Sequence, residues 1–273
     1  MRHPAVTGHM SLPVRMAVLT GLATCLLASA CSHSTHRTAS RRPTSTSTTT
    51  AAATVPTNNT TSPPSSTQAA TAPADSTLVA TTHGAIPSFA SPGGPTTGTV
   101  PATWHSAPST LPVIAERPGW LQVRLAQRPN GSTAWVHASD VDLASTPYRI
   151  LINLATTHLT LYRSGQPILS APVGIGLPAY PTPTGHYFLA FLASPPSPGY
   201  GAFVMVTSAH SDTITDWESS GDALVAIHGP LGSDAQIATH GATVSHGCIR
   251  MHESDLLQLR PIPVGSPIDV VAA

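Results

Sequence analysis

The residues best suited to chemistry lie together near the C-terminus, in the stretch Val244-Ser245-His246-Gly247-Cys248-Ile249-Arg250-Met251. A thiol such as that of Cys248 attacks only after losing its proton, and free cysteine has a pKa of about 8.5. A nearby histidine can take that proton, and backbone N–H groups can stabilise the oxyanion that then forms. Gly247 lets the backbone approach closely at such a position. The stretch therefore predicts a catalytic loop with Cys248 as its nucleophile.

A second histidine, His228, precedes Gly229 at the end of the apolar run Leu224-Val225-Ala226-Ile227. The run indicates a buried strand, and a side chain on a rigid element is well placed for catalysis. His240-Gly241 is another His-Gly pair close to Cys248, but no apolar strand precedes it. We therefore expect His228 to be the base and keep His240 as the alternative.

These residues resemble the catalytic domain of the L,D-transpeptidases, also called the YkuD type. The signature of that family is His-Gly, a variable loop, and Ser/Thr-His-Gly-Cys followed by an apolar residue and Asn or Arg. Here sixteen residues separate His228 from Ser245-His246-Gly247-Cys248-Ile249-Arg250. Upstream, Pro181-Thr182-Pro183-Thr184-Gly185 looks like the family's Thr-Pro-x-Gly turn. The resemblance covers residues 148–273 and departs from the family at Pro230, where a small hydroxyl residue is frequent.

The resemblance implies an acyl transfer on peptidoglycan stem peptides. Cys248 would attack the carbonyl between the diamino acid and the terminal D-Ala of a tetrapeptide stem, with His228 as the general base. The amine of a neighbouring stem would then resolve the thioester into a cross-link, although a protein or water are alternative acceptors. No cofactor, metal or ATP is expected, because the thioester conserves the bond energy. Carbapenem β-lactams are expected inhibitors.

The resemblance also implies roles for the rest of the loop. His246, with the amides of Gly247 and Cys248, would line the oxyanion site, and Ser245 would orient a histidine. Arg250 would either hold the loop or face a substrate carboxylate.

Three other functions compete with this interpretation. A zinc site could use His240, His246, Cys248 and His252, but structural zinc sites usually combine paired ligand units. A sortase-like enzyme is also a surface cysteine transpeptidase, but its nucleophile normally lies in a Thr-x-Thr-Cys strand. A non-catalytic wall-binding lipoprotein would leave the lone cysteine beside two histidines unexplained.

The elements that must position these residues are mainly strands. Alternating apolar residues begin near Ile150, a hairpin return follows at 158–162, and further strands are predicted at 168–173, 187–191, 202–207, 224–227 and 267–271. A helix is predicted around 254–259, capped by Ser254 or His252 and ended by Pro261. We predict a mainly β fold, with a β-sandwich catalytic domain over 147–273 that carries one or two short helices.

A smaller module is expected before it, over residues 98–146. A strand at 119–125, the turn Pro129-Asn130-Gly131 and a strand from Ala134 predict a small barrel. The pattern GWLQVRL…NGSTAWVHASDV resembles bacterial SH3-like domains, which often bind wall peptides. The alternative is that the module only packs against its neighbour.

The N-terminal part predicts export. Residues 1–31 indicate a signal peptide, and the ending Leu27-Ala28-Ser29-Ala30-Cys31 resembles a lipobox in which Cys31 becomes lipidated. Residues 32–97 are rich in Ser, Thr, Pro and Ala and predict a disordered tether. The formal net charge is zero and only 9% of residues are charged, so nothing favours nucleic-acid binding. We expect an envelope protein, anchored to the membrane through Cys31, that faces the cell wall.

Overall fold

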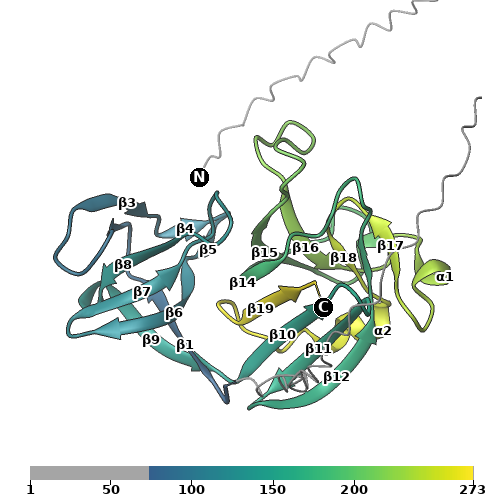
Figure 1. Cartoon of the computed structure of the whole chain (residues 1–273), viewed down its shortest axis with the longest axis horizontal. Coiled ribbons are helices and arrows are strands. Elements are labelled where there is room, and N and C mark those ends of the chain that lie inside the picture. Colours follow the sequence, from purple (N-terminus) through teal and green to yellow (C-terminus); the bar gives the residue numbers. More distant parts are fainter. Residues whose placement is uncertain (1–73, 273) are drawn as a thin grey trace, which may run out of the picture. The chain divides into compact units, whose positions relative to one another are not determined.

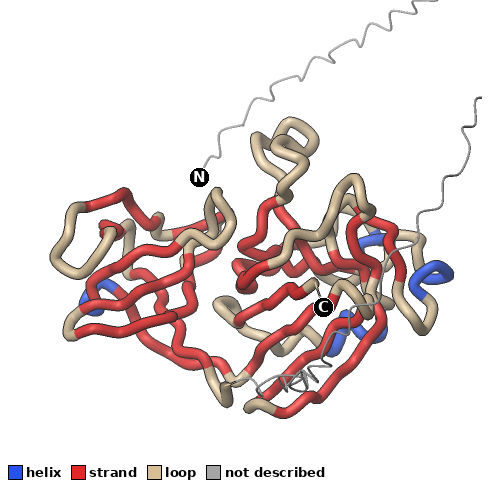
Figure 2. The backbone as a smooth tube through the Cα atoms, viewed as in Figure 1, coloured by secondary structure: helices blue, strands red, loops and turns tan. Residues whose placement is uncertain are grey.

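The computed structural model describes residues 74–272, and all of them fall within one compact unit. Strands make up about half of this part of the chain, and the helices are short (Figure 2). They form a seven-stranded N-terminal sheet, a ten-stranded C-terminal sheet and one small two-stranded ribbon (Figure 1). The predicted mainly β class is therefore confirmed.

The N-terminal sheet has the strand order β3-β2-β8-β7-β6-β1-β9. Its strands are β1 (Thr77–Thr82), β2 (Ile86–Phe89), β3 (Thr96–Val100), β6 (Thr110–Arg117), β7 (Trp120–Arg124), β8 (Thr133–His137) and β9 (Val141–Thr146). The ribbon pairs β4 (Thr103–Trp104) with β5 (Ala107–Pro108), and a 3₁₀ turn, η1 (Ala138–Asp140), precedes β9. The predicted hairpin is present as β7 and β8. Its assignment to the SH3-like class stays a prediction.

The prediction that the tether extends to residue 97 is wrong for its last part. Strand β1 pairs on one side with β6 and on the other with β9, and it buries Val79 and Ala80. Threonine and valine suit a pleated, half-buried surface even in a stretch of low overall hydrophobicity. The composition of 74–97 resembles that of a tether, but partners later in the chain supply the pairing and burial that order it.

The C-terminal sheet has the order β12-β11-β10-β19-β14-β15-β16-β18-β13-β17. Its strands are β10 (Tyr148–Asn153), β11 (His158–Arg163), β12 (Gln166–Pro172), β13 (Gly174–Gly176), β14 (Gly185–Ala193), β15 (Val204–His210), β16 (Leu224–His228), β17 (Ala242–Ser245), β18 (Ile249–Arg250) and β19 (Pro267–Val271). Each strand predicted in this region is present, with ends that differ by a few residues. The short strands β13, β17 and β18 were not predicted, because two to four residues are too few to show a period.

The helices lie in connections at the edges of the strands. Helix α2 (Glu253–Gln258) is the predicted one, with His252 at its N-cap position, and α1 (Asp234–Ile237) was not predicted. A 3₁₀ turn, η2 (Pro198–Tyr200), precedes β15. None of the helices in residues 74–272 has the length and apolar character needed to cross a membrane.

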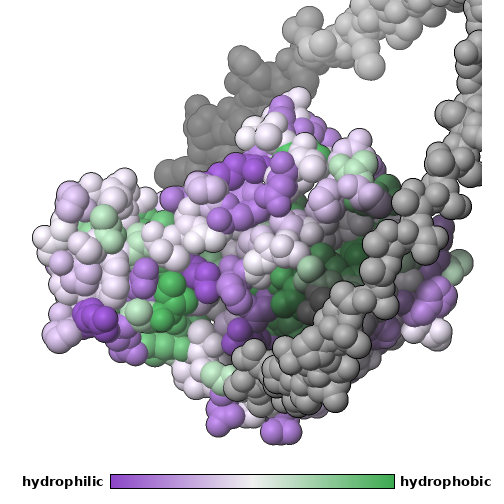
Figure 3. Space-filling view, viewed as in Figure 1, coloured by the Kyte–Doolittle hydropathy of each residue, from purple (hydrophilic) through white to green (hydrophobic). Residues whose placement is uncertain are grey.

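The central strands of the C-terminal sheet carry a different apolar cluster on each face. Val225 and Ile227 of β16 belong to a cluster with Ile249 and with Leu256 of α2. Ala226 belongs to a second cluster, together with Val204 and Val206 of β15 and buried side chains of the N-terminal sheet. Side chains of a strand alternate between its two faces, which explains this division. On the face drawn in Figure 3, apolar surface is limited to separate patches among hydrophilic and neutral residues.

Candidate active site

Strands β16 and β18 bring the two predicted catalytic residues together. The strands are parallel neighbours, with Ile227 opposite Ile249 and His228 opposite Arg250. Since aligned residues of adjacent strands share a face and Ile227 and Ile249 enter the core, the other face receives His228, Arg250 and Cys248. Local sequence cannot show this parallel pairing, because the two strands are separated by the loop that contains α1.

These side chains line one pocket with a volume of about 420 Å³. His228, Cys248, Ser245, His246 and Arg250 all contribute to its lining. The rest of the wall is largely apolar and aromatic, with contributions from Tyr200, Ile214, Trp217, Leu224 and Leu231. The pocket is large enough for part of a peptide and supplies few polar contacts beyond the predicted reactive groups.

His228 is buried, and its ring is held in one orientation. Its Nδ1 donates a hydrogen bond to the carbonyl of Gly229 at 2.8 Å, which leaves Nε2 as the acceptor nitrogen. The ring of Tyr200 packs against it, with centroids 4.6 Å apart. Burial lowers the pKa of His228 to about 4, against the opposing effect of the Gly229 carbonyl and helped by the charge of Arg250. At neutral pH His228 is therefore a neutral imidazole that can accept a proton.

Gly229 is required by the close approach of another segment. Its N–H donates to the carbonyl of Tyr200 at 2.8 Å. A Cβ on Gly229 would lie 2.7 Å from the backbone nitrogen of Gly201 and 2.8 Å from the carbonyl carbon of Tyr200. The glycine of the His-Gly pair thus lets η2 pack against the end of β16 and place Tyr200 over the imidazole.

Cys248 is half-buried and forms no disulfide. Burial raises the pKa of its thiol, while a hydrogen bond from the Ala226 backbone and the positive charge of Arg250 act in the opposite direction. Burial therefore disfavours both a thiolate on Cys248 and an imidazolium on His228. Both groups are therefore neutral at rest.

Ser245 braces the turn that carries Cys248, which differs from its predicted role. Its hydroxyl donates to the carbonyl of Cys248 at 2.6 Å and accepts from the N–H of Gly247 at 3.1 Å. Both hydrogen bonds that it makes among the described residues are to backbone, so the prediction that it orients a histidine is wrong. The Gly247 amide, predicted to line the oxyanion site, is already engaged by Ser245. The reason is local: a serine hydroxyl readily bonds backbone groups two or three residues further along the chain.

Thr182 holds the same turn from the opposite side. Its buried hydroxyl accepts a hydrogen bond from the N–H of Gly176 at 2.9 Å and donates one to the carbonyl of Gly247 at 2.8 Å. Gly247 has φ of +115°, a conformation that side chains rarely adopt. The turn before Cys248 is therefore fixed by two hydroxyl groups, Ser245 and Thr182. The sequence marked Thr182 only as part of a motif, because a contact across 65 residues leaves no local signal.

His246 and Arg250 lie at the pocket in different ways. His246 is exposed, and its ring lies 4.7 Å from that of Tyr180 and 5.7 Å from that of Trp217. Arg250 donates from a terminal guanidinium nitrogen to Ser233 Oγ at 2.7 Å, which ties β18 to the α1 connection. Its buried Nε has no hydrogen-bond partner among the described residues. Two roles were predicted for Arg250, and its contact to Ser233 agrees with the one in which it holds the loop.

The alternative histidines lie elsewhere. His240 is exposed and is absent from the lining of the pocket, and its carbonyl accepts a hydrogen bond from Thr157. His252 uses both ring nitrogens, Nδ1 to Asp234 at 2.6 Å and Nε2 to the carbonyl of Ala238 at 2.8 Å. Within residues 74–272, no three or more His, Cys, Asp and Glu residues are arranged to hold a metal ion. Cys31 lies outside the described residues, as do the predicted signal peptide and most of the predicted tether.

Two features of the pocket were missed in the sequence. Tyr200 stacks on His228, and the loop between β15 and β16 contributes Ile214 and Trp217. A tryptophan inside a polar loop was the signal available for Trp217, since an exposed aromatic residue often marks a binding surface. Tyr200 follows a proline-rich segment, and nothing local connects it to His228.

Comparison with known proteins gives a consistent assignment for this part of the chain. Residues 147–270 match the sequence model of the YkuD family, the L,D-transpeptidase catalytic domain. The YkuD protein of Bacillus subtilis, assigned to the L,D-transpeptidases, is 28% identical over 130 residues, which is 47% of this chain and 69% of that protein. The Bacillus licheniformis counterpart is 29% identical over 125 residues, which is 45% of this chain and 66% of that protein.

Solved structures give weaker likenesses. The L,D-transpeptidase LdtMt1 in complex with imipenem is 18% identical, with a TM-score of 0.39, 59% of this chain covered and 90% of that one. The catalytic domain of the E. faecium L,D-transpeptidase is 23% identical, with a TM-score of 0.33, 45% of this chain covered and 96% of that one. The assignment rests on the sequence comparisons, which coincide with the domain that holds Cys248 and His228. Residues 147–270 therefore match the YkuD family, and this part of the chain is an L,D-transpeptidase domain.

Proposed function

We propose that the chain cross-links peptidoglycan by acyl transfer through Cys248. The observation that carries this proposal is the placement of Cys248 and His228 on one face of the paired strands β16 and β18, in one pocket. A free thiol and a neutral, oriented imidazole are the two groups that nucleophilic acyl transfer needs. The family of residues 147–270 supplies the reaction class.

The ionisation of the two groups favours a general-base route. Because the pKa of Cys248 is raised and that of His228 is lowered to about 4, a preformed thiolate–imidazolium pair is not the resting state. His228 accepts the thiol proton as sulfur attacks the carbonyl carbon of the stem peptide. Collapse of the tetrahedral intermediate breaks the C–N bond, and His228 returns the proton to the departing D-alanine. The product is a thioester on Cys248.

The second half-reaction uses an amine of another stem peptide. The amine attacks the thioester carbonyl, His228 accepts its proton, and the Cys248 thiol is released as a peptide bond forms. No external energy source enters, because the free energy of the first peptide bond is retained in the thioester. Since the lining of the pocket is largely apolar, it can also exclude water, which would turn the reaction into simple hydrolysis.

The decisive experiment is intact-protein mass spectrometry of the chain incubated with a defined tetrapeptide muropeptide or with the carbapenem imipenem. Wild type should gain the acyl mass, and Cys248→Ser should not, because a serine hydroxyl is far harder to deprotonate. Loss of the nucleophile should reduce the acylation rate about 10³-fold or more. Circular dichroism serves as the folding control. A wild-type chain that gains no acyl mass, or a mutant that still does, would favour the wall-binding alternative.

The location of the enzyme is a separate proposal. The signal-like residues 1–31 and the lipobox-like ending at Cys31 favour export and a lipid anchor. A tether between anchor and enzyme would let the active site reach the wall from the membrane. Expression of Cys31→Ala should release the protein from the membrane fraction, and unchanged partition would count against the anchor.

A further inference from the structure

The loop between β15 and β16 forms one wall of the active-site pocket. Ser211, Ile214 and Trp217 of this loop line the pocket together with His228 and Cys248. The tip of the loop is held mainly by its own contacts, such as the Gly221 N–H to Asp216 and the Trp217 N–H to Asp222. Its position over the pocket must therefore be set at its base, where Ser211 and Ala223 pair through one backbone hydrogen bond of 2.8 Å.

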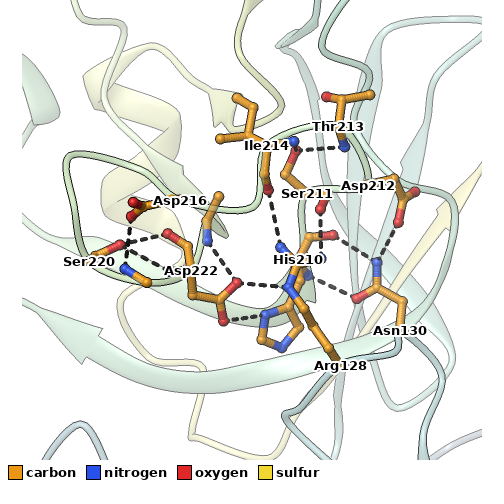
Figure 4. Close-up of polar contacts among 12 residues, drawn as sticks. Arg128, Asn130, His210, Ser211, Asp212, Thr213, Ile214, Asp216, Ser220 and Asp222 are labelled. Atoms are coloured by element: carbon orange, nitrogen blue, oxygen red, sulfur yellow. Dashed lines mark hydrogen bonds and ion pairs between the residues drawn. The ribbon is translucent and has the colours of Figure 1, made fainter.

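A residue of the N-terminal sheet region forms hydrogen bonds to the base of this loop. Arg128, in the β7–β8 turn, donates three hydrogen bonds from three different nitrogens (Figure 4). They reach the carboxylate of Asp222 at 3.0 Å, the carbonyl of Ser211 at 2.9 Å and the carbonyl of Ile214 at 3.1 Å. Ser211 lies at the start of the loop, Ile214 in its interior and Asp222 at its end. The planar guanidinium presents donors on three separate nitrogens to these acceptors, whereas a lysine would donate from a single nitrogen.

Asn130, two residues further along the same turn, fixes the end of β15. Its amide nitrogen donates to the carbonyl of His210 at 2.7 Å and to Asp212 at 3.1 Å, and its amide oxygen accepts from the His210 N–H at 2.9 Å. The paired bonds to His210 imitate the pairing of a neighbouring strand. Figure 4 shows Asn130 at the end of the loop base where His210 and Asp212 lie, and Arg128 between that end and Asp222.

The β7–β8 turn, which carries Arg128 and Asn130, is itself held by hydrogen bonds. It closes the hairpin of β7 and β8, whose five aligned residue pairs run from Trp120 with His137 to Arg124 with Thr133. Beyond the last pair, the Leu125 N–H donates to the Ser132 carbonyl at 2.9 Å. The Ser132 hydroxyl donates to the carbonyl of Pro129 at 2.7 Å. The N-terminal sheet thus presents Arg128 and Asn130 from a braced hairpin end.

On the side of the catalytic domain, the hydrogen-bonded pair of His210 and Asp222 receives Arg128. His210 is almost fully buried, and its Nδ1 donates to Asp222 at 2.7 Å. Asp222 therefore bonds Arg128 with one carboxylate oxygen and His210 with the other. This links the turn of the N-terminal sheet to both strands that flank the loop, β15 through His210 and β16 through the neighbouring Asp222.

We propose that Arg128 and Asn130 are positioning residues for the transpeptidase site, through which the N-terminal sheet sets the pocket wall formed by Ile214 and Trp217. In this arrangement the N-terminal sheet helps determine which substrates fit the pocket, in addition to any role in wall binding. The proposal rests on the proposed function for the identity of the substrate, but its geometry concerns the loop alone. Without the hydrogen bonds from Arg128 and Asn130, the loop must become ordered when substrate binds. The entropy lost in that ordering weakens binding and raises KM.

The test compares Arg128→Ala and Asn130→Ala with wild type in the full chain. Arg117→Ala is the matched control, because Arg117 is exposed in the same sheet and its side chain bonds only the adjacent Glu116 carbonyl among the described residues. For the two test variants we expect kcat/KM with a tetrapeptide muropeptide to fall about tenfold or more, mainly through KM, since small misplacements in an active site cost rate steeply. Alkylation of Cys248 by iodoacetamide, which is too small to need the wall, should be unchanged. Amide hydrogen exchange should rise in residues 211–222 and stay slow in β16.

Arg128→Lys keeps the charge beside Asp222 but not the three-way fork, so its KM should fall between those of wild type and Arg128→Ala. If the alanine variants match Arg117→Ala in KM and in loop exchange, the proposal is overturned. If iodoacetamide reactivity falls in step with kcat/KM, the residues act on the whole domain and the proposal is equally overturned. If Arg128→Ala does not fold, Asn130→Ala and Arg128→Lys decide by the same measurements. Failure of wild type to be acylated would instead refute the proposed function.

Discussion

Replacing Thr182 with valine removes a single oxygen atom from the turn that carries Cys248. Valine has nearly the shape of threonine, so packing is preserved while the hydroxyl is lost. Two buried backbone groups then lose their partner: the N–H of Gly176 and the carbonyl of Gly247. The change therefore tests whether the hydroxyl, rather than the volume of the side chain, holds the turn.

The expected loss of stability follows from these two bonds. A buried polar group left without a partner costs about 1–3 kcal/mol, so two such groups give about 2–4 kcal/mol after partial relaxation. For a domain of this size, 1 kcal/mol shifts Tm by about 2–4 °C, which places the expected loss near 5–15 °C. The rate of Cys248 acylation should also fall, because Gly247 at its positive φ sets the direction of the following residue.

Urea denaturation and imipenem acylation, followed by mass spectrometry, measure the two effects on one preparation. Thr184→Val is the matched control: Thr184 lies two residues away, is exposed, and its hydroxyl makes no hydrogen bond within residues 74–272. The control should behave as wild type. Equal unfolding free energies and equal acylation rates for the two variants would refute the role assigned to the Thr182 hydroxyl.

Four further predictions concern histidines and the N-terminal end of the folded part. His228→Ala should abolish acylation with the fold intact by circular dichroism, whereas His240→Ala should have little effect; the reverse ranking would identify His240 as the base. Because the pKa of His228 is lowered to about 4, kcat/KM of the wild type should hold as pH falls through 6.5 and decline only near pH 4, and a decline centred on 6.5 would contradict the buried neutral imidazole. The pKa of His252 is raised by a backbone carbonyl and by Asp234, so its contribution to stability is complete below about pH 6.5 and is lost as pH rises through the higher folded value. The Tm difference between wild type and His252→Gln should therefore shrink at alkaline pH, and a difference that grows would reverse the assignment. Limited proteolysis should leave a resistant fragment that begins before Thr77, and a fragment beginning near residue 98 would show that β1 is not stably paired.

The sequence predicted the strands whose own pattern is strong. The apolar run 224–227 and the Pro129-Asn130-Gly131 turn are local signals, and both correspond to elements of the structure. Strand β1 could not be recognised in the same way. Its threonines and alanine resemble the segment before it, and only β6 and β9, many residues later, give it partners.

The same distinction applies to the active site. Cys248 and His228 were found because their motifs are contiguous in the chain, and β16 and β18 place them on one face. The structure gives Ser245 a different role from the predicted one, because whether its hydroxyl bonds a histidine or the adjacent backbone depends on how the turn bends. Thr182, Tyr200 and Arg128 reach the site across long separations, which a single sequence does not encode locally.

The alternation along β16 has a consequence for how this enzyme can change in evolution or by design. Val225 and Ile227 belong to one core cluster, whereas Leu224, Ala226 and His228 lie on the opposite face, which includes lining of the pocket. Inserting or deleting one residue would therefore exchange the two faces. Ile227 would then enter the pocket and His228 the core, and catalysis and folding would fail together. The loop at 211–222 is constrained at its base, where Arg128 and Asn130 bond it, but its tip can lengthen or shorten. Variation in substrate preference should therefore accumulate as changes of loop length, while the length of β16 stays fixed.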